Sequence, residues 1–162
     1  MKKRIFVITI ISLFILSNLA FGQGYQFTDV CRNKATSVKN QARTGTCWCF
    51  ATTAFIESEL LRTGKGEFDL SEMFVVYQNY LNRLQDNYLR RGKGNIGEGS
   101  IAHMLINVYE TNGIVPQEVY NGINYDSDKH DHTELGLFLE AVANSAIKIK
   151  KRSPEYYEII NN

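Results

Sequence analysis

The sequence predicts a mainly α-helical domain behind a short targeting segment. Between residues 47 and 147, apolar side chains recur in four stretches at the 3.6-residue period of an α-helix. Cap residues or glycines stand at the ends of these stretches. With 44% hydrophobic residues, two prolines, no internal repeat and no low-complexity tract, the composition is that of a globular protein of one domain.

Residues 1–22 have the pattern of a secretory signal peptide. Three basic residues at positions 2–4 precede an apolar run from Ile5 to Leu16, and the small-residue pattern Ala20-Phe21-Gly22 follows. The apolar run is short for a membrane span of about 20 residues, so we expect cleavage after Gly22 rather than a retained anchor. The sequence thus predicts an exported bacterial protein, periplasmic or extracellular, with one domain in residues 23–162.

The balance of charge gives no sign of a nucleic-acid or membrane partner. Residues 1–22 carry three positive charges and no negative charge, so the formal net charge of +1 becomes −2 without them. A nearly neutral domain has no electrostatic reason to bind a polyanion or an anionic membrane. We therefore expect neither partner once the signal peptide is removed.

The first helix is predicted from about Cys47 to Thr63, with Gly64 as its C-terminal stop. Its main apolar face consists of Phe50, Ala51, Ala54, Phe55, Ser58 and Leu61. Ile56 and Leu60 lie on the other side, so we expect this helix to be apolar on two sides and central in the fold.

Three further helices follow, each with a start or stop signal. The second begins at Leu70-Ser71-Glu72 with Ser71 as the N-cap, and its stripe is Met73, Tyr77, Tyr80, Leu84 and Tyr88. The third runs from near Ser100 to Asn112-Gly113, with Ile101, Met104, Leu105 and Val108 as its stripe. The fourth begins at the capping sequence 131–134, with Leu135, Phe138, Leu139, Val142 and Ile147 as its stripe. A short last helix is expected from Ser153-Pro154-Glu155.

The stretch Asn40–Ala51 carries the strongest functional signal. Cys47 falls in the first turn of the first helix, where unpaired N–H groups and the positive end of the helix dipole favour a thiolate. Gln41 lies six residues upstream, across a segment that contains Gly45, and a loop of that length can bring its amide to the Cys47 backbone N–H. Two such donors beside a nucleophile form an oxyanion hole, in which one donor is worth about 2.7–4 kcal/mol of barrier.

Residue for residue, this stretch resembles the papain-like cysteine peptidases. Their pattern of Gln, a short loop and Gly-x-Cys-Trp-x-Phe corresponds here to Gln41, Gly45, Cys47, Trp48 and Phe50. A buried structural cysteine would explain Cys47 but not its neighbours at these spacings. Papain has a disulfide-forming cysteine where this sequence has Thr44. The bleomycin hydrolase and aminopeptidase C branch also lacks that cysteine, and its pattern fits residues 40–51 better.

The resemblance implies an α+β papain-like fold, of which this chain is mainly the helical half, with the β-rich half absent. It implies an exported cysteine-type peptidase in which Cys47 is the nucleophile and Gln41 contributes to the oxyanion hole, acting on a peptide or protein substrate without a cofactor. It also implies that Trp48 and the glycines Gly97 and Gly99 contact substrate. Glu98, which interrupts the two glycines, is expected to be a solvated loop carboxylate.

The family's catalytic histidine and asparagine lie roughly 130–150 residues beyond the cysteine, which is past about residue 177 here. We therefore expect an N-terminal part of a peptidase that is inactive by itself. The alternative is a catalytically inactive homologue that acts as a peptide- or protein-binding domain. His103, His130 and His132 all lie earlier in the chain, and no sequence signal places them beside Cys47.

The other cysteines and the polar segment 121–132 carry weaker signals. An odd count of three cysteines leaves at least one free thiol in an exported protein. Cys49 is expected to be packed on its helix, and a disulfide between Cys31 and Cys49 is not predicted.

The acidic and histidine residues of 121–132 match no closed zinc or EF-hand spacing, so we expect no metal.

Overall fold

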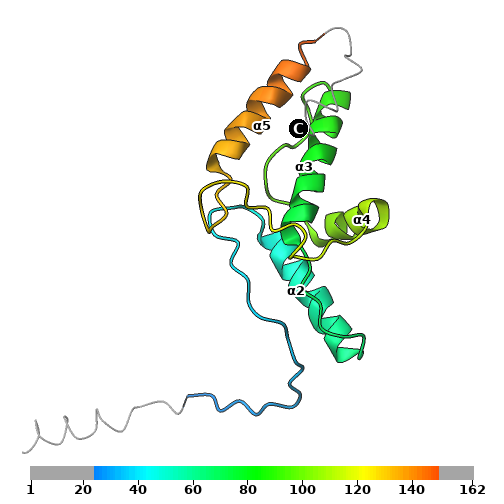
Figure 1. Ribbon diagram of the computed structural model, residues 1–162, viewed down its shortest axis with the longest axis vertical. Coiled ribbons are helices and arrows are strands. Elements are labelled where there is room, and N and C mark those ends of the chain that lie inside the picture. Colours follow the sequence, from blue (N-terminus) through cyan, green and yellow to red (C-terminus); the bar gives the residue numbers. More distant parts are fainter. Residues whose placement is uncertain (1–23, 150–162) are drawn as a thin grey trace, which may run out of the picture. The chain divides into compact units, whose positions relative to one another are not determined.

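Four helices account for the regular structure in the described residues, 24–149, of the computed structural model (Figure 1). They are α2 (Cys47–Arg62), α3 (Glu72–Leu89), α4 (Ala102–Asn112) and α5 (Thr133–Ala146). The chain divides after Arg32 into two units, and these helices belong to the second. The expected signal peptide and the expected last helix at Ser153 lie outside the described residues.

The predicted helix starts are confirmed to within about two residues, because they depend on chemistry close in sequence. The Ser71 hydroxyl accepts a hydrogen bond from the Phe74 N–H at 3.0 Å, as an N-cap does. The Asp131 carboxylate accepts one from the Thr133 N–H at 2.9 Å, just before α5. Gly64, at φ +71°, follows α2 in the left-handed region that glycine tolerates.

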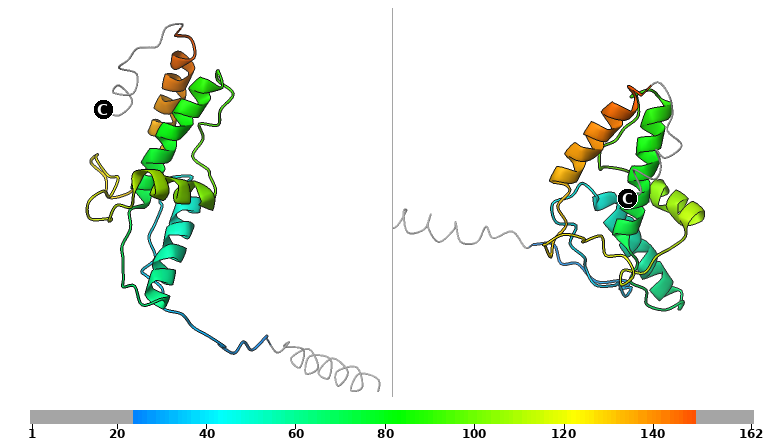
Figure 2. Two further views of the ribbon diagram at one scale, coloured as in Figure 1. Left: turned by 90° about the vertical axis from the view of Figure 1, so that its right-hand side faces the viewer. Right: turned by 45° about the horizontal axis from the view of Figure 1, so that its top comes forward.

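Helix α3 is central, since α2, α4 and α5 all pack against it. Figure 2 shows α4 running across α3, whereas α5 lies alongside its C-terminal half. The core consists of Trp48 and Cys49 from α2, Met73, Val75, Val76 and Tyr80 from α3, and Leu105 and Val108 from α4. The stripe predicted for α3 is confirmed, with Met73, Tyr80 and Leu84 buried and the other two tyrosines half-buried.

The apolar face predicted for α2 is wrong. The buried side of this helix carries Cys49, Thr53 and Glu57, which are four residues apart. Phe55, from the predicted face, is 64% exposed, and Ala51 and Ala54 are exposed as well. Helical periodicity ranks faces by hydrophobicity, so it does not detect a polar face whose buried groups have partners elsewhere in the chain.

That polar face belongs to an ionic cluster around Lys39, in which Glu57 and Glu72 are buried and Asp69 is exposed. The Lys39 Nζ lies 3.3 Å from Glu57 Oε1, 2.7 Å from Asp69 Oδ1 and 2.8 Å from Glu72 Oε1, and it donates to the Leu70 carbonyl at 2.8 Å. Burial opposes the charge of Lys39, but hydrogen bonds to Asp69 and Glu72 outweigh it and raise the lysine pKa. Because a buried carboxylate is costly without a partner, the cluster ties the segment before Asn40 to α2 and α3.

The stripe predicted for α5 is also buried only in part. Its buried residues are Ala143 and Ala146, whereas Leu135, Phe138 and Val142 are 39%, 62% and 40% exposed. Leu135 and Phe138 line an open groove between α3 and α5. On α4, Leu105 and Val108 are buried as predicted, but Ile101 before its first turn is 62% exposed.

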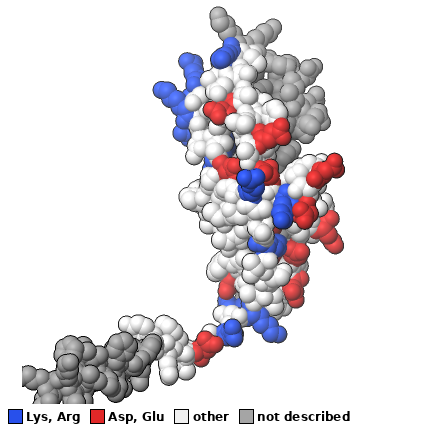
Figure 3. All heavy atoms as spheres, turned by 90° about the vertical axis from the view of Figure 1, so that its left-hand side faces the viewer, with Lys and Arg blue, Asp and Glu red and all other residues white. Residues whose placement is uncertain are grey.

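Basic and acidic side chains are interspersed over the face of the protein in Figure 3, in keeping with the formal net charge of +1 for the whole sequence. None of the helices in residues 24–149 combines the length and the apolar character that crossing a membrane requires.

Candidate active site

Cys47 is the first residue of α2, and its side chain is exposed. The preceding residue, Thr46, is fully buried, and its carbonyl accepts hydrogen bonds from the Cys49 and Phe50 N–H groups at 2.9 and 3.3 Å. Cys47 therefore lies at an anchored helix start with its thiol open to solvent.

Gln41 closes the loop that leads to this helix start. Its Nε2 donates to the Thr44 carbonyl at 2.6 Å, and the Thr44 hydroxyl donates back to the Gln41 carbonyl at 3.0 Å. Ala42 adopts φ +51° within the loop, and its N–H donates to Asn40 Oδ1 at 2.8 Å. A carboxamide nitrogen has two protons, so this contact leaves Gln41 one further donor.

Trp48 and the glycine loop lie against the same turn. The buried Trp48 donates from its indole Nε1 to the Glu98 carbonyl at 3.1 Å. The Gly45 N–H donates to the Glu98 carboxylate. Gly97 and Gly99 flank Glu98, so the structure brings the loop that was expected to contact substrate next to the turn that bears Cys47. The expectation that Glu98 is a solvated loop carboxylate is wrong, because its oxygen is hydrogen bonded within the fold.

The segment 130–132 lies beside the same loop, which the sequence did not signal. The Arg43 N–H donates to the His130 carbonyl at 3.0 Å, and the His132 N–H donates to the Arg43 carbonyl at 3.1 Å, which makes a short parallel bridge. The Arg43 guanidinium also lies 3.5 Å from Asp131. The signal that was missed is tertiary pairing across 88 residues, which no local pattern reveals.

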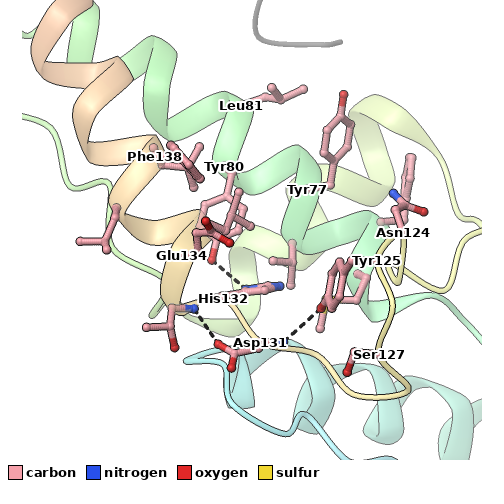
Figure 4. Close-up of a pocket in the computed structure, with 18 of the residues that line it drawn as sticks. Tyr77, Tyr80, Leu81, Asn124, Tyr125, Ser127, Asp131, His132, Glu134 and Phe138 are labelled. Carbon is pink, nitrogen blue, oxygen red and sulfur yellow. Dashed lines mark hydrogen bonds between the residues drawn. The ribbon is translucent and has the colours of Figure 1, made fainter.

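Both histidines of this segment are buried. The His132 Nδ1 lies 3.1 Å from the Tyr80 hydroxyl and 3.7 Å from Glu98 Oε2, and Figure 4 shows its ring directed at α3. The His130 ring packs edge-on against Phe50, with centroids 6.4 Å apart, and within the described residues its Nδ1 has no hydrogen-bond partner. Burial lowers the pKa of each, helped at His130 by the neighbouring His132 and opposed at His132 by Glu98 and Asp131.

Cys49 differs from Cys47 in its exposure to solvent. It is fully buried, and its thiol donates to the Glu72 carbonyl at 3.4 Å. Burial, with a further contribution from the charge of Glu72, raises the pKa of this thiol to about 12. The helix-packed role expected for Cys49 is therefore confirmed.

The open groove between α3 and α5 is separate from the helix start at Cys47. Tyr77, Tyr80 and Leu81 line one side and Phe138 the other, with the segment 124–132 at one end (Figure 4). Its lining includes His132 but none of the five site residues expected from the sequence. Among residues 24–149, no three acidic, histidine or cysteine side chains gather as a metal site would require.

Comparison with known proteins identifies the family. Residues 26–154 match the papain family of cysteine proteases. The chain belongs to this family. The papain-family match covers the loop from Gln41, the start of α2, the glycine loop and the segment 130–132.

A papain-family relative supports the assignment. The viral cathepsin of Lymantria dispar multicapsid nuclear polyhedrosis virus is 44% identical over 45 residues, which are 28% of this chain and 13% of the cathepsin. The aligned part is therefore a small share of that relative's length.

Proposed function

We propose that this chain is the helical part of an exported cysteine peptidase in which Cys47 is the nucleophile. The observation that carries the proposal is the exposed Cys47 thiol at the first turn of α2, with the loop closed by Gln41 directly before it. Membership of the papain family supports the same assignment.

In the proposed reaction, the Cys47 thiolate attacks the carbonyl carbon of a peptide bond, and the carbonyl oxygen becomes an oxyanion. The remaining Gln41 amide proton and the Cys47 backbone N–H donate to that oxygen. A general acid then protonates the leaving amine as the bond breaks, and water hydrolyses the acyl-enzyme to release the second product.

We propose that one histidine, in a β-rich half of the fold, serves as both acid and base in these steps, as the family resemblance implies. His130 and His132 suit that role poorly. His132 faces Tyr80 and Glu98, and His130 is buried against Phe50. We therefore expect residues 1–162 alone not to turn over peptides.

The proposed substrate is a peptide or protein bound in an extended conformation along the glycine loop. Gly99 supports this assignment, since a Cβ there would meet no atom within 4 Å, so the backbone is open to an approaching chain. Trp48, which anchors this loop through Glu98, would form the floor beside Cys47. Asn40 and Thr44 favour the bleomycin hydrolase and aminopeptidase C branch as the nearest subgroup.

The decisive experiment compares Cys47→Ala with Cys49→Ala. Peptide and aminoacyl fluorogenic substrates are assayed under reducing conditions, with residues 1–162 and with a native protein that joins residues 23–162 to a β-rich half. We expect turnover only from the longer protein, its loss in Cys47→Ala, and its retention in Cys49→Ala.

Labelling with limiting iodoacetamide tests the same assignment without turnover, and we expect Cys47 to be modified before Cys49. Preferential labelling of Cys49 or Cys31 would contradict the assignment of the nucleophile. Turnover by residues 1–162 that is lost in His130→Asn or His132→Asn would show that the base is local.

The alternative, a non-catalytic peptide- or protein-binding domain, makes the opposite prediction. A native protein of any length would then bind peptides without cleaving them, and Cys47→Ala would leave that binding unchanged. A binding domain does not require an exposed thiol at the start of a helix, whereas a cysteine peptidase does, so we favour the peptidase.

Export is proposed from the order of basic, apolar and small residues in 1–22. We expect amino-terminal sequencing of the protein from its native host to begin at Gln23. An intact Met1 on a cytoplasmic species would contradict export.

A further inference from the structure

Glu98 holds the turn that bears Cys47 from both sides. Its carboxylate accepts the Gly45 N–H, two residues before the cysteine, and its backbone carbonyl accepts the Trp48 indole N–H at 3.1 Å, one residue after it. A Cβ on Gly45 would lie 3.0 Å from the Glu98 Cβ, so the two residues pack closely.

Helix α3 fixes Glu98 in turn. The Arg83 guanidinium donates to the Gly97 carbonyl and, at 2.5 Å, to the Gly99 carbonyl, which are the residues on either side of Glu98. Arg83 thereby immobilises the backbone of the loop and, through it, the Glu98 carbonyl. The described contacts form a continuous path from the central helix to the Cys47 turn.

The Glu98 carboxylate also lies near His132. Its Oε2 faces His132 Nδ1 at 3.7 Å, and the His132 backbone N–H is bonded to the Arg43 carbonyl in the loop before Cys47. Glu98 thus lies where α3, the segment 130–132 and the start of α2 meet. Its side chain is only 27% exposed.

We propose that Glu98 is a positioning residue for Cys47, which fixes the turn through Gly45 and Trp48 and so sets the direction of the thiol. The inference rests on the proposed function of Cys47 as the nucleophile. Placement matters because attack requires the reacting atoms at about 3–3.5 Å in a defined orientation, and a displacement of about 1 Å can cost roughly 100-fold in rate.

Two variants separate the hydrogen bond from the charge. Glu98→Gln removes the negative charge but keeps an oxygen that accepts the Gly45 N–H, whereas Glu98→Ala removes both. Glu59→Gln is the matched control. Glu59 lies on α2, the helix that begins at Cys47, but its carboxylate is bonded to Arg62, away from the turn.

The rate of hydrogen exchange at the Gly45 N–H, followed by NMR in residues 23–162, measures directly whether the hydrogen bond from Gly45 to Glu98 is formed. Gly45 is exposed, so its amide has little protection apart from Glu98. We expect exchange to be about tenfold faster in Glu98→Ala and close to wild type in Glu98→Gln and Glu59→Gln. Unchanged exchange in Glu98→Ala, or equal acceleration in Glu98→Gln, would overturn the proposal.

Turnover is measured in the native protein that includes the β-rich half. We expect kcat to fall by about tenfold or more in Glu98→Ala with KM changed by less than about threefold, and Glu98→Gln to restore most of kcat. Equal losses in the two variants would mean that charge matters and the hydrogen bond does not, which contradicts positioning. If the wild type shows no turnover, the proposed peptidase function fails while the exchange of Gly45 still decides the role of Glu98.

A second route covers the case in which Glu98→Ala does not fold. Arg83→Gln leaves Glu98 in place and removes the guanidinium contacts to Gly97 and Gly99. We expect faster exchange of Gly45 in this variant too, and wild-type exchange there would contradict a rigid path from α3 to the turn.

Discussion

At the scale of single residues, the buried pair His130 and His132 makes the fold sensitive to acid. The two rings come from one short segment, and both lie out of solvent beside the loop that leads to Cys47. Burial lowers the pKa of each ring below its ordinary value of 6.5. Above that pH the rings are neutral, and His132 Nδ1 is hydrogen bonded to the Tyr80 hydroxyl at 3.1 Å.

Stability should therefore fall as pH drops below 6.5. In the unfolded chain both histidines bind protons near pH 6.5, whereas in the folded chain they resist until a lower pH, so between these two values the unfolded state binds more protons. We expect the double variant His130→Asn/His132→Asn to lose less free energy of unfolding than the wild type between pH 7 and about pH 5. Urea denaturation at several pH values measures this.

His103→Asn serves as the control, because this histidine is exposed on α4 and its substitution should keep the wild-type pH dependence. A double variant whose stability follows the wild-type curve at every pH would contradict the prediction.

At the scale of helices, the starts were predictable from the sequence, and so was the buried face of α3, but the buried faces of α2 and α5 were not. Ser71 caps α3 through a bond that spans three residues, and such contacts depend on little else. The burial of Glu57 depends instead on Lys39, which is 18 residues away, and the burial of Ala143 on where α5 meets α3. Hydrophobic spacing identified an apolar side on α2 and α5, but the position of the neighbouring helices decides which side is covered.

Two glycines, one packed against α3 and one within α5, give opposite expectations for substitution by alanine. Gly122 has φ +75°, and a Cβ there would lie 2.3 Å from the Met73 Cβ in α3. Gly136 lies within α5, where a Cβ would meet no atom within 4 Å. We expect Gly122→Ala to destabilise the fold by about 1–3 kcal/mol, through backbone strain and overpacking. Gly136→Ala should stabilise it by up to about 1 kcal/mol, through helix propensity.

Urea denaturation of both variants at pH 7 is the measurement. Because the two substitutions are chemically identical, each is the other's control. Shifts of the same sign would show that the geometry around Gly122 or Gly136 is not as described.

At the scale of the whole molecule, the candidate site divides into a local part and an assembled part. Gln41, Gly45, Cys47 and Trp48 lie within eight residues, so the sequence alone predicted their grouping and its resemblance to the papain family. Glu98 and the segment 130–132 reach the same place across 53 and 88 residues, by pairings that only the folded chain creates. The sequence therefore predicted the residues of the candidate site that are close in the chain, but not the distant residues that contact them.

These long separations also determine when the Cys47 turn can be completed during synthesis. Arg43 pairs with a segment centred on Asp131, 88 residues later, which a ribosome adding about 5–20 residues per second reaches some 4–18 s afterwards. During that interval the Arg43 backbone lacks the partners that it has in the folded protein. The Gly45 N–H lacks its acceptor until Glu98, 53 residues later, has been added. Cys47, the proposed nucleophile, is thus translated early, and the turn that bears it is completed late, after the chain has grown past α4.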